Sequence, residues 1–481
     1  MSTTNPNILV IHCDSMSGTA MRWVGHPAAC TPNLDRLAQR GVGFTNNYCN
    51  SPQCVPSRAS LVSGRYTHSI GAWNNFKGLE PGDPTLFEDA RRAGYQLGLI
   101  GRNDYRSGSH SLGARVLAWA RSAGINLPEK KRPRAIVETE ASRRVRNHDW
   151  DQVDAAGEFF EEQSNEDAPF FCWLGFCQPH PMGGYTTSPH YLKNIDPDAV
   201  TMPTHDPLEH PVCRHSSVAK HTFDPLPEEE TLAVRRHYLG MVAEVDAMVG
   251  EVLQNLEKAG LADNTVVVFF SDHGDMQLEH RQWLKNSFYE PCARVPLIMA
   301  GPGIAATGDC EDLVSLIDLR PTLCEIMDRR PPAECEGRSL GPALSGRPLP
   351  PEPVLTQYHS NMMCTGGFML REGDWKYVAY ANYEPQLFNL AADPGETVNL
   401  ADDESAVRAE MDSRLRQMVD YEDVDRLAKV EDRQCFRGWR RAVEDEKYRE
   451  ALTGLWRGFE QEHFNHIDRW LEEGEDAVSV D

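Results

Sequence analysis

Residues 51–60, Ser-Pro-Gln-Cys-Val-Pro-Ser-Arg-Ala-Ser, lie between a strand-like segment and a helix-like segment. They contain one cysteine, Cys54, followed at fixed offsets by Pro56, Ser57 and Arg58. A side chain at a strand-to-helix turn points outward and meets the positive end of the helix dipole. A lone cysteine is more often a small apolar residue, but the prolines and the permanent charge of Arg58 favour an exposed turn. We therefore interpret Cys54 as the precursor of a catalytic nucleophile.

The segments around this turn alternate between short apolar runs and helical patterns, which indicates an α/β protein. We expect a large, mixed but mostly parallel sheet flanked by helices, because near-continuous apolar runs are typical of strands buried on both faces. The predicted strands span residues 7–12, 96–100, 170–176, 265–270 and 295–300. The predicted helices span residues 31–41, 86–93, 151–162, 227–259 and 316–327. In the first helix, Thr31 is the expected cap and Gly41 the expected stop.

The pattern changes near residues 348–353, which are rich in proline. Alternating segments at 354–358, 367–371 and 375–380 predict a small antiparallel sheet, followed by a helix over 403–420 and an amphipathic helical tail over 429–474. We expect a catalytic domain over 1–350 and a C-terminal subdomain over 351–481. The aromatic face of the tail is expected to pack on the protein's own body or on a second subunit, which makes a homo-oligomer one expectation. Its members are Trp439, Trp456, Phe459, Phe464 and Trp470.

Two long polar segments interrupt the catalytic part. Residues 107–148 contain the basic run Lys-Lys-Arg-Pro-Arg at 130–134, and we expect this segment to lie over the site rather than in the core. Residues 181–227 are rich in proline and histidine and are expected to be irregular. Structureless segments of that length usually carry function or are mobile.

Composition excludes some classes of function. The formal net charge of -24 argues against nucleic acid and anionic membrane surfaces as partners, although a local basic pocket can still bind a small anion. No apolar run approaches the length of a membrane span, and no export signal is evident at the N-terminus. The 13 cysteines include no Cys-x-x-Cys pair, so we expect reduced thiols and a cytoplasmic location.

Carboxylates and an imidazole follow two of the predicted strands. Asp14 comes after the first strand, and Asp272-His273 comes directly after the strand over 265–270. Strand ends on one edge of a sheet converge, so these groups predict a divalent-cation site beside Cys54. Asp14 alone would more often be a cap or turn residue. A cysteine hydrolase with a thiolate–histidine pair is the rival interpretation, but it leaves this acidic cluster unexplained.

The motif Cys54-Val-Pro-Ser-Arg58, with Ser63-Gly-Arg65 after it, resembles the signature of the type I sulfatases of the alkaline phosphatase superfamily. The resemblance extends over nearly the whole chain, including Asp393-Pro-Gly-Glu396 in the C-terminal part. It implies the fold of that superfamily and conversion of Cys54 to formylglycine by a formylglycine-generating enzyme. It further implies a metal bound by Asp14, Cys54, Asp272 and His273. The catalytic residues it implies are Cys54, Arg58, Arg102, His180 and Lys285, with Lys285 binding sulfate and His180 protonating the leaving group.

Further stretches are similar to the glucuronate-2-sulfatase branch of that family, which implies aryl sulfates or a 2-O-sulfated uronic acid as substrates. Weaker candidates for substrate contact are Lys77, His110 and His359. Three positions depart from the usual family pattern: Ser15 replaces a second aspartate, Arg102 replaces a lysine but keeps its positive charge, and Asp104 replaces a histidine two residues after it. We hypothesise that His110 takes the place of that histidine.

Three questions stay open at the level of sequence. All-oxygen sites favour Ca²⁺, while the His273 nitrogen leaves Mn²⁺ as an alternative. A phosphonate monoester or phosphodiester hydrolase of the same superfamily is the alternative function, because a phosphodiester carries the same single negative charge as a sulfate monoester. A binding protein whose Cys54 is never oxidised is the non-enzymatic alternative. A choline sulfatase fits less well, since no aromatic cage for a quaternary ammonium is evident.

Overall fold

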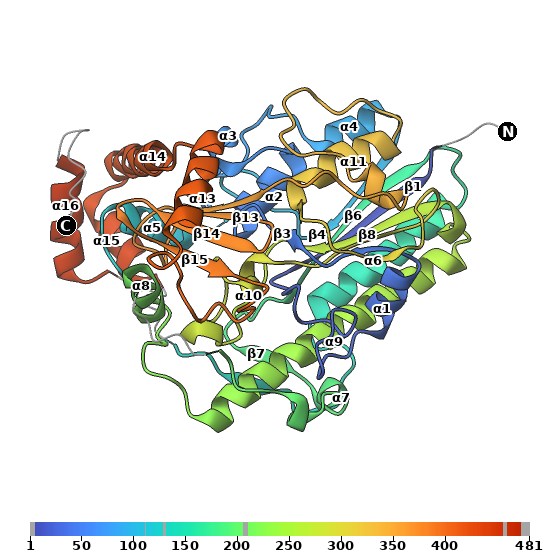
Figure 1. The fold of residues 1–481 in the computed structure, drawn as a ribbon, viewed down its shortest axis with the longest axis horizontal. Helices are drawn as coiled ribbons and strands as arrows, with labels where there is room; N and C mark the ends of the chain where they lie inside the picture. Colours follow the sequence, from blue (N-terminus) through green and yellow to red (C-terminus); the bar gives the residue numbers. More distant parts are fainter. Residues whose placement is uncertain (1–4, 111, 128–130, 205–209, 456–458, 473–481) are drawn as a thin grey trace.

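A seven-stranded sheet forms the centre of the computed structural model, which describes residues 5–110, 112–127, 131–204, 210–455 and 459–472 (Figure 1). The strand order is β10-β2-β9-β8-β1-β6-β4. The bounds are β1 (Asn7–Asp14), β2 (Gly41–Phe44), β4 (Gln96–Gly101), β6 (Phe170–Pro179), β8 (Thr265–Ser271), β9 (Leu297–Ala300) and β10 (Gly308–Cys310). Strand β1 runs parallel to both β6 and β8, and only β9 pairs antiparallel with its neighbours. The predicted fold class, a mixed but mostly parallel α/β sheet, is confirmed.

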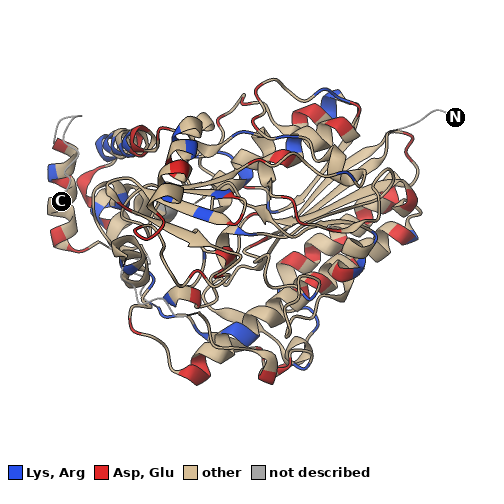
Figure 2. Cartoon of the chain, viewed as in Figure 1, with Lys and Arg blue, Asp and Glu red and all other residues tan. Residues whose placement is uncertain are grey.

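Side chains of the central strands alternate between two hydrophobic clusters, one on each face of the sheet. In β1, Leu9 and Ile11 pack with α1 (Pro32–Gln39), α6 (Asn147–Gln163) and α9 (Glu228–Lys258). Ile8 and Val10 point to the other face, which is covered by α2 (Cys54–Ser63), α4 (Leu86–Arg92) and α11 (Leu319–Ile326). The strands carry almost no charged residues, whereas the outer helices carry both signs (Figure 2). Burial on both faces makes this sheet a rigid support for polar groups at its edge.

A four-stranded antiparallel sheet follows in the C-terminal part. It consists of β12 (Val354–Tyr358), β13 (Gly367–Glu372), β14 (Trp375–Tyr380) and β15 (Tyr383–Asn389), in that order. The first three strands confirm the prediction, and β15 was missed because its first residues are exposed and do not alternate with apolar ones. Helix α13 (Ser405–Met418) packs on this sheet through Met411 and Leu415.

The C-terminal tail and part of the segment 107–148 share one hydrophobic cluster. Helix α5 (Leu112–Ser122) packs with α14 (Tyr421–Ala442), α15 (Asp445–Thr453) and α16 (Gln461–Glu472). The rings of Trp119 and Phe436 stack with centroids 4.6 Å apart. The prediction that 107–148 lies outside the core is therefore wrong for α5. The described aromatic residues of the tail pack on the protein's own body, and the homo-oligomer stays a prediction.

The structure does not describe every residue of the predicted tail, and it does not test the predicted domain boundary. Trp456 and residues 473–474 fall outside the described residues. The predicted boundary at residue 350 stays a prediction, and the cluster joining α5 to the tail crosses it.

Three other sequence predictions need correction. The segment 181–227 is not irregular throughout: it forms β7 (Tyr185–Thr187), α7 (Pro189–Leu192) and α8 (Pro211–Ala219). Strand β7 pairs with β5 (Ala135–Val137). Helix α1 ends at Gln39, and Gly41 begins β2 instead of ending the helix. Thr31 occupies the cap position, but its side chain makes no capping hydrogen bond and donates to Asp35 Oδ1 instead.

The remaining elements are short. They are β3 (Asn47–Tyr48), α3 (Thr67–Ile70), α10 (Glu290–Ala293), β11 (Val314–Ser315), α12 (Gly341–Leu344) and the 3-10 turns Pro197–Ala199, Ala262–Asn264, Glu279–Arg281 and Leu316–Asp318. Within the described part of the chain, no helix combines the length and the apolar character needed to cross a bilayer.

Candidate active site

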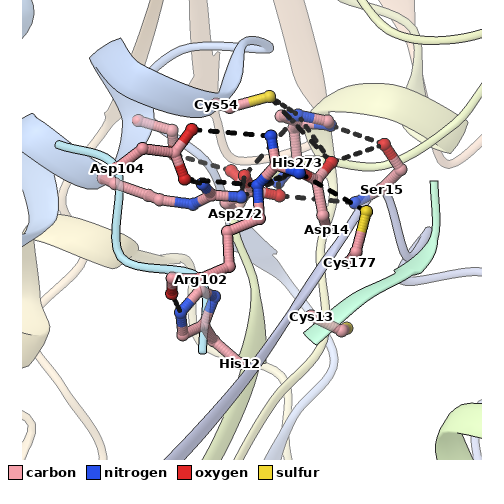
Figure 3. Close-up of polar contacts among 12 residues, drawn as sticks. His12, Cys13, Asp14, Ser15, Cys54, Arg102, Asp104, Cys177, Asp272 and His273 are labelled. Atoms are coloured by element: carbon pink, nitrogen blue, oxygen red, sulfur yellow. Dashed lines mark hydrogen bonds and ion pairs between the residues drawn. The ribbon is translucent and has the colours of Figure 1, made fainter. Parts of the chain in front are cut away.

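Four predicted metal-site residues meet at the carboxyl edge of the central sheet (Figure 3). Asp14 ends β1, Asp272 and His273 follow β8 directly, and Cys54 is the first residue of α2. One ligand-capable atom from each lies within 4.8 Å of the others, and all four residues are buried. The parallel register of β1 and β8 pairs Cys13 with Ser271, so the two acidic positions that follow are neighbours.

The donor set fits one divalent cation. Two ligands that bind one Ca²⁺ at 2.3–2.6 Å are separated by no more than about 5 Å, which agrees with the 4.8 Å spread of this cluster. Asp272 Oδ2 is buried, accepts no well-aligned hydrogen bond from the described residues, and has Arg58 Nη2 beside it as an ion-pair partner at 2.7 Å. The His273 Nδ1 atom lies 3.0 Å from the Gly274 carbonyl oxygen, so Nδ1 donates there and the Nε2 lone pair faces the cluster. Burial lowers the pKa of His273, which keeps the imidazole neutral and able to bind a metal.

Three cations surround these acids. Arg58 Nη2 lies 2.8 Å from Asp14 Oδ2 and 2.7 Å from Asp272 Oδ2. Lys285 Nζ lies 2.6 Å from Cys54 Sγ and 3.8 Å from Asp14 Oδ1. Arg102 Nε lies 3.4 Å from Asp14 Oδ2. Positive groups therefore face the nucleophile position, where the oxygens of an anionic ester would bind.

The environment of Cys54 disfavours a thiolate mechanism. Burial and the neighbouring Asp14 carboxylate raise the pKa of the Cys54 thiol to about 12, although Lys285 opposes that rise. A thiol pKa this high disfavours the thiolate that a cysteine nucleophile needs at neutral pH. This raised pKa argues against the interpretation of the protein as a cysteine hydrolase, which would need a Cys54 thiolate.

Asp104, one of the departures from the usual pattern, joins Arg58, Arg102 and His110 in one network. Its carboxylate accepts hydrogen bonds from Arg58 Nη1, from Arg102 Nε at 3.2 Å and from His110 Nε2. Burial opposes ionisation of Asp104, but Arg58 and the His110 hydrogen bond lower its pKa, so the group is a carboxylate. The site thus holds Asp14, Asp104 and Asp272 against three cations. The structure brings His110 into this network through Asp104, whereas the sequence suggested His110 only because the resemblance to the glucuronate-2-sulfatase branch includes it.

His180 follows the end of β6 and lies close enough to Lys285 and Asp14 for their charges to influence it. Burial and then Lys285 lower its pKa well below the ordinary value, and its Nδ1 atom has no hydrogen-bond partner among the described residues. The ring is therefore neutral in the free enzyme. A bound anionic ester would offset the Lys285 charge and raise the proton affinity of the ring.

Buried acids hold the backbone next to His180. The Asp149 carboxylate accepts from the Cys177 N–H at 3.0 Å and from the Gln178 N–H at 2.7 Å. Glu244 Oε2 accepts from Gln178 Nε2 at 2.9 Å. These two acids were missed from sequence. The signal for them is a lone acid on the apolar face of a helix pattern, at 149 in α6 and at 244 in α9.

The two other substrate-contact candidates are not brought into this cluster. Lys77 Nζ pairs with Glu80 at 2.8 Å and Glu431 at 2.9 Å. His359 is only 1% exposed and packs against the rings of Trp73 and Phe368. The next residue, Ser360, contacts the nucleophile turn: its Oγ atom accepts a hydrogen bond from Gln53 Nε2 at 3.3 Å.

The chain is similar to known sulfatases in sequence and in fold. The sulfatase family model matches residues 6–329, and the model for the C-terminal part of N-sulphoglucosamine sulphohydrolase matches residues 278–421. Arylsulfatase K of Bos taurus is 34% identical over 99% of this chain and 94% of its own length. Among solved structures, a 2-O GAG sulfatase has a TM-score of 0.69 and 27% identity, covering 87% of this chain and 93% of that one. A phosphonate monoester hydrolase of Agrobacterium radiobacter has a TM-score of 0.69 and 26% identity, covering 86% and 95%.

Proposed function

The chain belongs to the sulfatase family and hydrolyses sulfate monoesters, and from this premise we propose that its natural substrate is a 2-O-sulfated uronic acid. The resemblance predicted from the motif at residues 54–58 is confirmed at the level of family and reaction. Support for the substrate proposal comes from the arylsulfatase K relatives and from the similar solved structure of a 2-O GAG sulfatase. The buried cluster of Asp14, Cys54, Asp272 and His273, with Lys285 beside it, is the observation that carries ester hydrolysis, and the choice of a uronate rests on those relatives.

The family implies a divalent cation and a formylglycine nucleophile. When both are present, the aldehyde hydrate at position 54 supplies the attacking oxygen and the metal lowers the pKa of that oxygen. We propose that Asp14, Asp272 and His273 hold the cation and that it is Ca²⁺, with Mn²⁺ as the alternative. Carboxylate oxygens are the ligands that Ca²⁺ prefers, and the single imidazole nitrogen of His273 is compatible with Mn²⁺.

The other catalytic roles fall to side chains of the chain itself. Lys285 and Arg102 bind the sulfuryl oxygens and stabilise the charge that develops on them. Arg58 holds the carboxylates of Asp14 and Asp272 in place through its two ion pairs. His180 donates a proton to the leaving oxygen. His110, bonded to Asp104, orients that carboxylate toward Arg58.

We further propose that a formylglycine-generating enzyme acts on this chain before it folds. Cys54 is only 1% exposed and lies inside the first turn of α2, with Arg58 of the same motif also 1% exposed. A modifying enzyme cannot contact these side chains in the folded protein. The proposed setting remains cytoplasmic, and its support is that none of the 13 cysteines forms a disulfide.

A comparison of ester classes tests the proposed function. The matured enzyme should turn over 4-nitrophenyl sulfate and a 2-O-sulfated glucuronate disaccharide at least about 100-fold more efficiently than a 4-nitrophenyl phosphodiester, as kcat/KM. That ratio corresponds to roughly 3 kcal/mol of differential transition-state binding. Faster turnover of the phosphodiester would instead favour the phosphonate or phosphodiester hydrolase alternative. Equal turnover of sulfated glucuronate and an uncharged sulfated sugar would contradict the uronate proposal alone.

Replacing His180 by alanine should affect substrates according to their leaving groups. A nitrophenolate departs without much help from a proton, whereas an alkoxide of a sugar needs one. We expect His180→Ala to lower kcat by about 10-fold or less for nitrophenyl sulfate, and on the order of 10³-fold for a sugar sulfate. Steady-state kinetics with both substrates measures the difference. An equal loss for both would show that His180 does not act as the leaving-group acid.

A further inference from the structure

The segment that carries Lys285 has an unusual backbone. Between residues 277 and 286, six non-glycine residues have φ angles between 49° and 71°. L-residues adopt this left-handed region rarely, and such conformations persist only where the surrounding structure enforces them. The residues are Gln277, Leu278, His280, Arg281, Leu284 and Asn286. Lys285 therefore lies between two strained positions, and its placement depends on whatever holds this segment.

Lys220 holds the segment at Lys285 itself. It follows α8 directly, is fully buried, and donates from Nζ to the Lys285 carbonyl oxygen at 2.6 Å and to Gln282 Oε1 at 2.9 Å. The Trp283 indole N–H donates back to the Lys220 carbonyl oxygen at 2.8 Å. Thr222, two residues on, donates to the Arg281 carbonyl oxygen at 2.5 Å. Residues 220–222 thus bind the strained segment at several points.

The other side of Lys285 is bound to the nucleophile turn. The N–H of Asn286 donates to the Pro52 carbonyl oxygen at 3.1 Å, and Lys285 Nζ lies 2.6 Å from Cys54 Sγ. The backbone of Lys285 is therefore fixed between Lys220 and Pro52. A small displacement on the Lys220 side would move the Lys285 ammonium relative to Cys54.

A lysine at position 220 is a costly choice for stability alone. Its ammonium is removed from water and bonded to a carbonyl and an amide oxygen, and burial lowers its pKa to about 8. An apolar side chain of similar length would avoid this desolvation. Packing alone does not explain a buried ammonium group at position 220, whereas its hydrogen bond to the Lys285 carbonyl does.

We propose that Lys220 is a positioning residue for sulfate recognition, holding the Lys285 carbonyl so that the Lys285 ammonium reaches the sulfuryl oxygens. This inference rests on the proposed sulfate-binding role of Lys285. Lys220 itself is fully buried and acts only through the segment it binds.

The test uses the matured enzyme with Lys220→Met, which keeps the volume and removes the donors. Kinetics with 4-nitrophenyl sulfate should show kcat/KM reduced by roughly 10–100-fold, the usual cost of losing a supporting hydrogen bond at a site. The inhibition constant of inorganic sulfate should rise by about 10-fold. Asp246→Ala is the matched control, because the buried Asp246 carboxylate bonds the N–H groups of Asn33 and Leu34 in α1. It should lower Tm without changing sulfate inhibition.

A double-mutant cycle separates positioning from a merely structural effect. If Lys220 acts through Lys285, then Lys220→Met should change the activity of the Lys285→Ala enzyme by less than about 2-fold. An equal fall in both backgrounds, or unchanged sulfate inhibition in Lys220→Met, would overturn the proposal. Full activity of Lys285→Ala would instead remove the role of Lys285, and the inference with it. Lys220→Gln, which keeps a shorter donor, provides a second variant and should show the same effects at smaller size.

Discussion

Cys54→Ala is expected to abolish turnover of sulfate esters, with a loss on the order of 10⁴–10⁶-fold, as when the nucleophile of other covalent enzymes is removed. Alanine cannot be converted to an aldehyde, so no hydrated group stands beside Lys285 and the metal residues. The fold should survive, because Cys54 is the first residue of α2 and its sulfur makes no bond that the helix needs. Initial rates with 4-nitrophenyl sulfate, together with Tm, measure both statements.

Cys49→Ala is the matched control for this variant. Cys49 is another fully buried cysteine close to the same turn, and its loss creates a similar small cavity. It should keep near wild-type turnover. Retention of more than about 1% of activity by Cys54→Ala would contradict a nucleophile made from Cys54.

The mass of the protein gives an independent measure of the same prediction. Formylglycine is about 18 Da lighter than cysteine on atomic masses, so mature and immature chains separate by intact mass. Specific activity should rise in proportion to the lighter fraction. A fully active sample of unmodified mass would show that the Cys54 thiol works directly, against its pKa of about 12.

The sequence predicts the part of the site that depends on strand ends. Asp14, Asp272 and His273 follow apolar runs, and the parallel geometry of a sheet brings such positions together whatever their separation along the chain. The motif at residues 54–58 is local, so its turn is also predictable. Five of the seven central strands appear as apolar runs in the same way, and four of them are buried on both faces, whereas β4 is a half-exposed edge strand.

The rest of the site depends on contacts between loops, which no periodicity describes. The ion pair that joins Arg58 to Asp104, and the hydrogen bond from Lys220 to the Lys285 carbonyl, connect segments with no shared pattern. The helix α5 was misjudged for a related reason. Its surroundings are polar and basic in sequence, but its own apolar face, with Trp119, finds a partner only in the distant tail. Whether such a helix is buried depends on its tertiary contacts, and these cannot be predicted from the local pattern of a single sequence.

Removing the divalent cation is expected to reduce turnover on the order of 10³-fold, because the metal supplies several kcal/mol of charge stabilisation and each 1.36 kcal/mol is tenfold in rate. The measurement is dialysis against a chelator followed by addition of Ca²⁺ or Mn²⁺ in parallel. Recovery with Ca²⁺ at lower concentration than with Mn²⁺ supports the proposed cation. The reverse order would assign Mn²⁺, and full activity after chelation, with metal absent by elemental analysis, would contradict a metal-dependent site.

Asp272→Asn sharpens this prediction, because it removes a charge while keeping the shape of the side chain. Without the cation, Asp14, Asp104 and Asp272 balance Arg58, Arg102 and Lys285, so the site has no net charge to offer an anionic ester. A divalent cation gives it a net charge of about +2, which attracts the ester and favours an ionised nucleophile. In Asp272→Asn the cation should bind roughly 100-fold more weakly, and saturating metal should restore turnover only in part. Arg58 also loses one of its partners, so the added metal cannot replace the carboxylate that held the guanidinium beside Asp14.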